Sequence, residues 1–211
     1  RNEKLSIVNF SFWKYGFFAS LSNVTTQLLV SIDIILIGNI LNNMELVTAF
    51  RYVSIIPYSL LFLSQVVIVT DFVDFTEKIN DKKYIYTYIK NYMKLFSIIS
   101  VICIAFIYFF GIYLLQLFDS DYDQYQPSLL ILTIGVTGIL IIRGLFGNLL
   151  SSIGKAHINF VITSIALLLN IIFNYQLIPE YGILGAATTS SILMWFTGVL
   201  SLLFFFYYFK K

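Results

Sequence analysis

Six apolar runs, each long enough to cross a lipid bilayer as a helix, constrain this 211-residue chain more than any other feature. A helix of about 20 residues spans the hydrocarbon layer of roughly 30 Å. We expect membrane-spanning helices near residues 15–41, 47–70, 95–117, 128–150, 158–177 and 183–206. The composition agrees: 11% of the residues are charged, against about 25% in soluble domains. The predicted fold class is all-α, a polytopic membrane bundle of six helices.

One connection between the predicted spans is long. Residues 71–94 are charged and rich in tyrosine, a pattern typical of an amphipathic helix that lies along the membrane surface. We expect such a helix on the cytoplasmic side. A plain solvated linker is the alternative interpretation.

The charges outside the apolar runs are segregated by loop. Acidic residues without any basic neighbour occupy every second loop: Glu45, then Asp119, Asp121 and Asp123, then Glu180. The remaining loops and the two ends hold the basic residues Arg1, Lys4, Lys14, Lys78, Lys82, Lys83, Lys90, Lys94, Lys155, Lys210 and Lys211. Positive residues mark the cytoplasmic side of membrane proteins. The pattern therefore predicts six spans with both termini in the cytoplasm.

The last two predicted spans are joined by the short sequence "IPEYG". Pro179 cannot donate a backbone hydrogen bond and should end the first helix. Gly182 can adopt the positive φ that a chain reversal requires. We expect both residues to have a purely structural role in a tight turn.

Two predicted spans carry stripes of polar side chains. In the first span Asn23 and Gln27 continue a stripe that includes Gly16, Ser20 and Ser31. In the fifth, Asn170 and Asn174 follow Asn159 and Thr163 at helical spacing. Amides that face lipid would be unsatisfied and costly, so we expect the stripes to line a polar cavity. The alternative is hydrogen bonding between helices.

Three charged residues lie at membrane depth: Asp33, Arg51 and Arg143. Intramembrane charges pair with one another or line a pathway, so we expect an Asp33–Arg51 pair or the extension of Arg51 toward the outer interface. No span offers an anionic partner for Arg143. Its alternatives are a role in substrate binding and the extension of its side chain toward the cytoplasm.

The sequence gives no sign of enzymatic chemistry. It has one histidine and one cysteine, Cys103, and these form no recognisable metal or catalytic set. We therefore expect no catalytic residue, no cofactor, no metal site and no nucleic-acid partner.

Residues 169–189, "LNIIFNYQLIPEYGILGAATT", resemble a signature of bacterial polysaccharide flippases of the multidrug/oligosaccharidyl-lipid/polysaccharide (MOP) exporter superfamily. Shorter similarities occur at residues 31–41 and 149–158. The matching positions are Leu169, Asn170, Asn174, Leu177, Ile178, Pro179, Tyr181, Gly182, Ile183, Gly185, Ala186 and Ala187.

The resemblance implies that this chain is the C-terminal six-helix lobe of a two-lobe transporter of the bacterial inner membrane. Such a protein moves an oligosaccharide linked to undecaprenyl diphosphate across the membrane through a central cavity. The partners implied are this glycolipid, membrane lipid and an N-terminal six-helix lobe, in the same chain or a second one. For the cavity, the candidates are Arg143, Asp33, Arg51, Asn23, Gln27, Asn170 and Asn174.

Other functions stay open at this point. A cation-coupled drug exporter and a flippase for lipid II or teichoic acid belong to the same transport class. A polysaccharide polymerase or acyltransferase would need a larger outer loop or a histidine within the membrane. A membrane remnant or scaffold without transport activity is the third class.

Overall fold

The computed structural model describes residues 10–210, and this part of the chain is helical without any strand. The helices are α1 (Phe10–Leu41), α2 (Met44–Ser59), α3 (Leu61–Glu77), α4 (Lys82–Gln116), α5 (Gln126–Gly138), α6 (Gly144–Ser152), α7 (Ala156–Tyr181) and α8 (Ile183–Lys210). A 3₁₀ helix, η1 (Ser120–Tyr125), precedes α5, and a π-helical turn, η2 (Ile139–Arg143), joins α5 to α6.

These elements form six stretches long and apolar enough to cross a membrane. α2 and α3 form one such stretch, and η1 to α6 form another. The stretches are Trp13–Leu41, Met44–Glu77, Lys82–Gln116, Ser120–Ser152, Ala156–Tyr181 and Ile183–Lys210. The prediction of an all-α membrane bundle with six spanning helices is confirmed.

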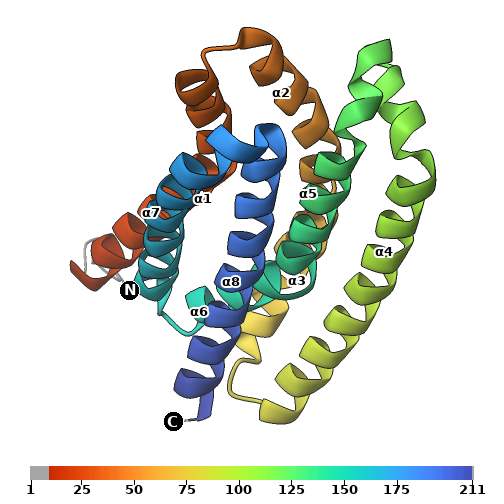
Figure 1. Ribbon diagram of the computed structural model, residues 1–211. Helices are drawn as coiled ribbons and strands as arrows, with labels where there is room; N and C mark the ends of the chain where they lie inside the picture. The colour runs from red at the N-terminus through yellow and green to blue at the C-terminus, as the bar shows by residue number, and fades with distance from the viewer. Residues whose placement is uncertain (1–9, 211) are drawn as a thin grey trace, which may run out of the picture.

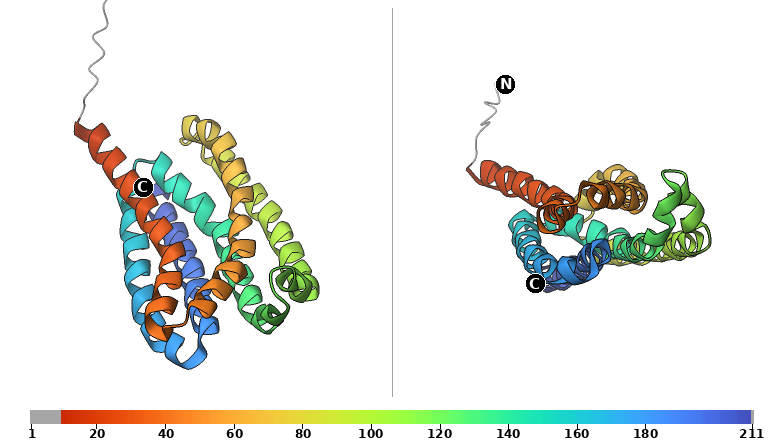
Figure 2. Two further views of the ribbon diagram at one scale, coloured as in Figure 1. Left: turned by 90° about the horizontal axis from the view of Figure 1, so that it is seen from above. Right: turned by 45° about the horizontal axis from the view of Figure 1, so that its top comes forward.

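The spans run alternately up and down in a single bundle (Figures 1 and 2). α7 packs against both α1 and α8, and α8 continues the packing to α5. α4 packs mainly against α5 and lies at the edge of the bundle, where Figure 1 shows it in green. One side of α4 is therefore left uncovered by the chain itself.

The basic and acidic loops lie at opposite ends of this bundle (Figure 1). The lower end in that view holds the start of α1, the α3–α4 and α6–α7 turns and the end of α8, with Lys14, Lys78, Lys155 and Lys210. The upper end holds the α1–α2 turn, η1 and the α7–α8 turn, with Glu45 and Glu180. Arg1, Lys4 and Lys211 fall outside the described residues.

Residues 71–94 do not form the separate surface helix that the sequence led us to expect. α3 continues through Glu77 and α4 begins at Lys82, with a short turn between them. Asp81 caps α4 by accepting a hydrogen bond from the backbone N–H of Tyr84. The charged segment is thus the extension of two spans, in which buried Phe75 and Ile85 continue the packing.

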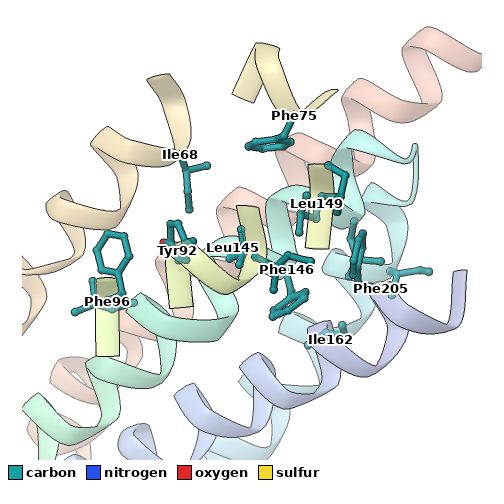
Figure 3. Packing of buried hydrophobic residues seen from close by; sticks show 14 of the residues in the cluster. Ile68, Phe75, Tyr92, Phe96, Leu145, Phe146, Leu149, Ile162 and Phe205 are labelled. Atoms are coloured by element: carbon teal, nitrogen blue, oxygen red, sulfur yellow. The ribbon is translucent and has the colours of Figure 1, made fainter. Parts of the chain in front are cut away.

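Apolar side chains fill the bundle in two clusters. The larger one joins α3, α4, α6, α7 and α8 near the lower end, and Figure 3 shows Ile68, Tyr92, Phe146 and Phe205 among its members. The second joins α1, α2, α4, α5 and α8 near the upper end, with one residue each from η1 and α7, around the fully buried Phe50. The two clusters leave a region between α1, α3 and α6 in which polar side chains gather.

The turn between α7 and α8 was predicted correctly, but the prediction that Pro179 ends the helix is wrong. α7 continues through Pro179 to Tyr181, and Gly182 reverses the chain with φ 57° and ψ −135°. Gly185 follows in close contact with α7, since a Cβ there would lie 2.4 Å from the carbonyl oxygen of Leu177. The small residue permits this contact.

Candidate functional site

A cavity of about 690 Å³ with both polar and apolar side chains in its wall opens between α1, the α2–α3 junction and α6. α1 contributes Asn23 and Gln27, which were predicted to face a cavity. Both side chains are exposed, and neither makes a hydrogen bond within the described part of the chain. The other polar residues of the wall are Tyr15, Ser22, Thr26, Tyr58, Ser59, Ser64, Gln65, Arg143, Asn148, Ser151 and Asn159.

Arg143 lies in this wall, half-buried, at the end of the π-helical turn η2. Its Nη1 donates to Oδ1 of Asn159 at 2.8 Å and to Oγ of Ser201 at 2.7 Å. A guanidinium has five N–H donors, two of them on Nη1. The Nε and Nη2 donors make no hydrogen bond with the described residues, so this edge of the guanidinium can serve a ligand.

No ion pair compensates the charge of Arg143 within residues 10–210. Its partners within the described residues are a neutral amide and a hydroxyl. A buried charge without a counter-ion is costly. A site of this kind favours an anion that comes from outside the chain.

The guanidinium of Arg143 lies close to the backbone of α6, where Gly147 has no side chain. A Cβ at Gly147 would lie 2.7 Å from Nη1 of Arg143. The side-chain amide of Asn159 packs against the same part of α6, where it donates to the carbonyl oxygen of Gly147 at 2.6 Å and to Oγ of Ser151 at 3.0 Å. Arg143 is therefore fixed at one end by α7 and α8 while its free edge stays available.

Asn159 belongs to the polar stripe predicted for the fifth span, whereas Ser201 and the π-helical turn were not predicted from the sequence. A π turn holds an additional residue and changes the direction in which the next side chains point, and such turns are frequent at functional sites. Repeated glycines in the predicted fourth span were the available signal, at positions 135, 138, 144 and 147.

A second polar cluster surrounds Asp33, which is fully buried on α1. Its Oδ1 accepts hydrogen bonds from Nδ2 of Asn170 at 3.0 Å and from Nδ2 of Asn174 at 2.7 Å. Its Oδ2 accepts a hydrogen bond from the hydroxyl of Ser190 on α8. Asn170 and Asn174 are also fully buried, so these amides join helices and do not line the cavity.

The predicted Asp33–Arg51 pair is absent. Asp33 faces α7 and α8, where three uncharged donors satisfy its carboxylate, whereas Arg51 is exposed on α2 and lies outside the cavity wall. Of the predicted cavity residues, Asn23, Gln27 and Arg143 line it, and Asp33, Arg51, Asn170 and Asn174 do not.

The Asp33 cluster has the ligand types that a small hard cation prefers. Oδ1 of Asn174 is buried without a hydrogen-bond partner in the described residues, close to the carboxylate that accepts from its own Nδ2. Carboxylate and amide oxygens bind such cations. The described residues contain no group of three or more His, Cys, Asp or Glu side chains that could hold a metal ion.

Part of this chain is similar to known membrane proteins. Residues 79–176 match the MatE family model, from the α3–α4 turn to the upper part of α7. The match covers 98 of the 211 residues and shows a similarity to the MatE family. This agrees with the resemblance found at residues 169–189, and the MatE match includes Arg143, Asn159, Asn170 and Asn174.

Two curated relatives each match less than half of this chain. The "Capsular polysaccharide biosynthesis protein CapF" of Staphylococcus aureus is 38% identical over 77 residues, which are 36% of this chain and 19% of that protein. The "Uncharacterized membrane protein MJ1068" of Methanocaldococcus jannaschii is 34% identical over 101 residues, 46% of this chain and 20% of that protein. This chain thus matches about a fifth of each relative's length. No solved structure matches it.

Proposed function

We propose that this chain is one six-helix lobe of a flippase that moves an undecaprenyl-diphosphate-linked oligosaccharide across the bacterial cell membrane. The transported glycolipid would supply the biosynthesis of a surface polysaccharide. The match to the MatE family model and the similarity to a protein named for capsular polysaccharide biosynthesis support this function. The transport step makes and breaks no covalent bond, so the proposal includes no catalytic residue.

The free edge of Arg143 in the cavity wall is the observation that carries the proposal. A diphosphate offers several anionic oxygens, and guanidinium binds a phosphate through paired N–H donors. Nη1 is already used by Asn159 and Ser201, which leaves Nε and Nη2 for two oxygens of one phosphate. Asn23 and Gln27 offer uncharged hydrogen-bonding groups in the same cavity, as a polar glycan headgroup requires.

The exposed polar face of α1 is an argument for the presence of a second lobe. Gly16, Ser20, Asn23, Gln27 and Ser31 are all exposed. Amides in contact with lipid tails would lack hydrogen bonds. We infer that an N-terminal six-helix lobe faces this stripe and closes the cavity between the two lobes.

The orientation proposed here places both termini in the cytoplasm. Basic residues gather at the lower end of the bundle in Figure 1, and acidic residues gather at the upper end. The positive end of a multi-pass protein stays on the cytoplasmic side. The mouth of the cavity near Tyr15, whose hydroxyl donates to the carbonyl oxygen of Ser151, then faces the cytoplasm.

The test is the substitution of Arg143 in the full-length protein, expressed in a host that lacks its own flippase. We expect Arg143→Ala to abolish surface polysaccharide at normal protein abundance and Arg143→Lys to restore part of it, because lysine lacks the paired donors. Arg51→Ala is the matched control and should retain export, since Arg51 lies outside the cavity wall. Normal polysaccharide from Arg143→Ala would overturn the proposal and favour a structural arginine or a scaffold without transport activity.

The Asp33 cluster favours a second candidate function, in which export of a substrate is coupled to a cation. The observation behind it is the buried oxygen of Asn174 without a partner beside the carboxylate of Asp33. In this case transport into vesicles would follow a cation gradient in the parent protein and lose that dependence in Asp33→Asn. If a cation gradient had no effect on transport by the parent protein, cation-coupled export would be excluded.

A further inference from the structure

α4 is longer than a membrane crossing requires. Its 35 residues make a helix of about 52 Å at a rise of ~1.5 Å per residue, whereas the hydrocarbon layer is roughly 30 Å thick. The stretch from Leu95 to Leu117 holds no charged residue and is about 34 Å long. The excess therefore lies at the N-terminal end of α4, before Leu95.

No other described helix of the chain covers the outward face of this apolar stretch. Val101 is 67% exposed, and Phe109 is 69% exposed. The other large apolar or aromatic residues exposed along this part of α4 are Leu95, Ile98, Ile102, Phe106, Tyr108, Phe110, Ile112, Tyr113 and Leu117. An apolar surface of this length on an edge helix faces lipid tails.

Three lysines continue the same face toward the lower end of the bundle. Lys83, Lys90 and Lys94 are separated by seven and four residues, a spacing that places them on one side of a helix. All three are exposed. Ile85 and Ile89 are buried in the core on the opposite side of α4. We call Lys83, Lys90 and Lys94 the basic stripe.

The ammonium groups of the basic stripe have no carboxylate within ion-pair distance in residues 10–210. Other lysines at this end are engaged: Nζ of Lys78 lies 4.8 Å from the ring centre of Tyr84, and Nζ of Lys155 lies 4.8 Å from that of Tyr208. The nearby Asp71 accepts a hydrogen bond from Tyr88. The basic stripe therefore has no ion-pair partner among the described residues and is open to an anionic partner from outside the chain.

We propose that the basic stripe binds the headgroups of anionic phospholipids in the leaflet beside α4. Lys94 directly precedes the lipid-facing run, which places its ammonium at the level of the lipid phosphates. Lys90 lies about 6 Å farther along the axis and Lys83 about 16 Å, and both have flexible stems that extend toward the surface. The face is open and continuous with the lipid-facing surface, which fits a layer of headgroups rather than a free phosphate in a pocket.

The experiment compares the association of spin-labelled phosphatidylglycerol and phosphatidylcholine with the full-length protein in bilayers, by electron paramagnetic resonance. The first variant is Lys83→Gln/Lys90→Gln/Lys94→Gln. A matched control, Lys14→Gln/Lys82→Gln/Lys210→Gln, removes the same charge from exposed lysines outside the basic stripe. A third variant replaces the three lysines of the stripe by arginine. Size-exclusion profiles establish that each variant is folded.

We expect the parent protein to prefer phosphatidylglycerol, and salt to weaken this preference. The preference should fall roughly tenfold in the glutamine variant of the stripe, since lysines near an anionic surface contribute strongly to binding. The control and the arginine variant should stay close to the parent. An unchanged preference in the glutamine variant, or an equal fall in the control, would overturn the proposal. The result does not depend on which substrate the protein exports.

Discussion

The side-chain amide of Asn174 donates to Oδ1 of Asp33 at 2.7 Å and so joins two helices whose contact residues are 141 positions apart. Asn174 also donates to Oδ1 of Asn170 at 2.9 Å, and Ser190 adds α8 to the same cluster. Three spans therefore meet at one buried carboxylate. In a membrane, where apolar burial does not drive helices together, such polar contacts stabilise the packing.

Removal of the Asn174 amide should destabilise the bundle. Asn174→Ala leaves the buried Asp33 carboxylate with fewer donors, at a cost of roughly 1–3 kcal/mol. We expect a lower melting temperature in detergent. Asn39→Ala provides the control, because Asn39 is an exposed asparagine on the same helix as Asp33 and makes no hydrogen bond with the described residues. Equal melting temperatures for the two variants would contradict a role of Asn174 in holding α1 to α7.

The proposed orientation predicts opposite labelling of the two ends of the bundle. In a Cys103→Ala background, Asp121→Cys should react with a membrane-impermeant maleimide in intact cells, and Asn80→Cys should react only after permeabilisation. Both positions are exposed, Asp121 in η1 and Asn80 in the α3–α4 turn. The reversed pattern would show that the basic end lies outside.

The number of spans and the separation of charge could be predicted because both depend on composition and length alone. The path of residues 71–94 could not, since a charged amphipathic segment has the same pattern whether it lies on a membrane or extends a span. Phe75 and Ile85 are buried in the core of the bundle, and this tertiary packing keeps the segment in the extensions of α3 and α4.

The predicted polar residues were found, but their pairing was partly wrong. Their spacing from the ends of the predicted spans suggested a similar depth for Asp33 and Arg51, and such spacing carries no information on rotation about the helix axis. The rotation of α1 relative to α2, α7 and α8 decides the partner, and it directs Asp33 to Asn170 and Asn174. The π-helical turn η2 also changes the direction in which the side chain of Arg143 points. Sequence periodicity assumes a regular α-helix, so it could not predict this direction.

The α7–α8 turn depends on Gly182 more than on Pro179. Gly182 has φ 57° and ψ −135°, a conformation available almost only to glycine. Gly182→Ala should cost on the order of 1–3 kcal/mol and lower the yield of folded protein, whereas Pro179→Ala should be tolerated because α7 already runs through that position. Fluorescence-detected size exclusion measures both yields. A larger loss from Pro179→Ala would show that the proline, and not the glycine, sets the turn.

Gly147 offers a way to displace Arg143 without removing its charge. A Cβ at position 147 would lie 2.7 Å from Nη1, so Gly147→Ala should push the guanidinium away from Asn159 and Ser201. The obstructed atom is the end of a flexible side chain, and we therefore expect the protein to stay folded. If Arg143 binds the substrate as proposed, loss of this charged contact should lower export about tenfold, equivalent to ~1.4 kcal/mol.

The matched control for that variant is Gly111→Ala on α4. Its Cβ would lie 3.3 Å from a side-chain carbon of Leu129, and α4 contributes no residue to the cavity wall. Export at matched protein abundance should therefore stay near the parent level for Gly111→Ala and fall for Gly147→Ala, with similar melting temperatures for both. Full export by a folded Gly147→Ala protein would mean that the position of the guanidinium is unimportant, and it would count against Arg143 as the residue that holds the diphosphate.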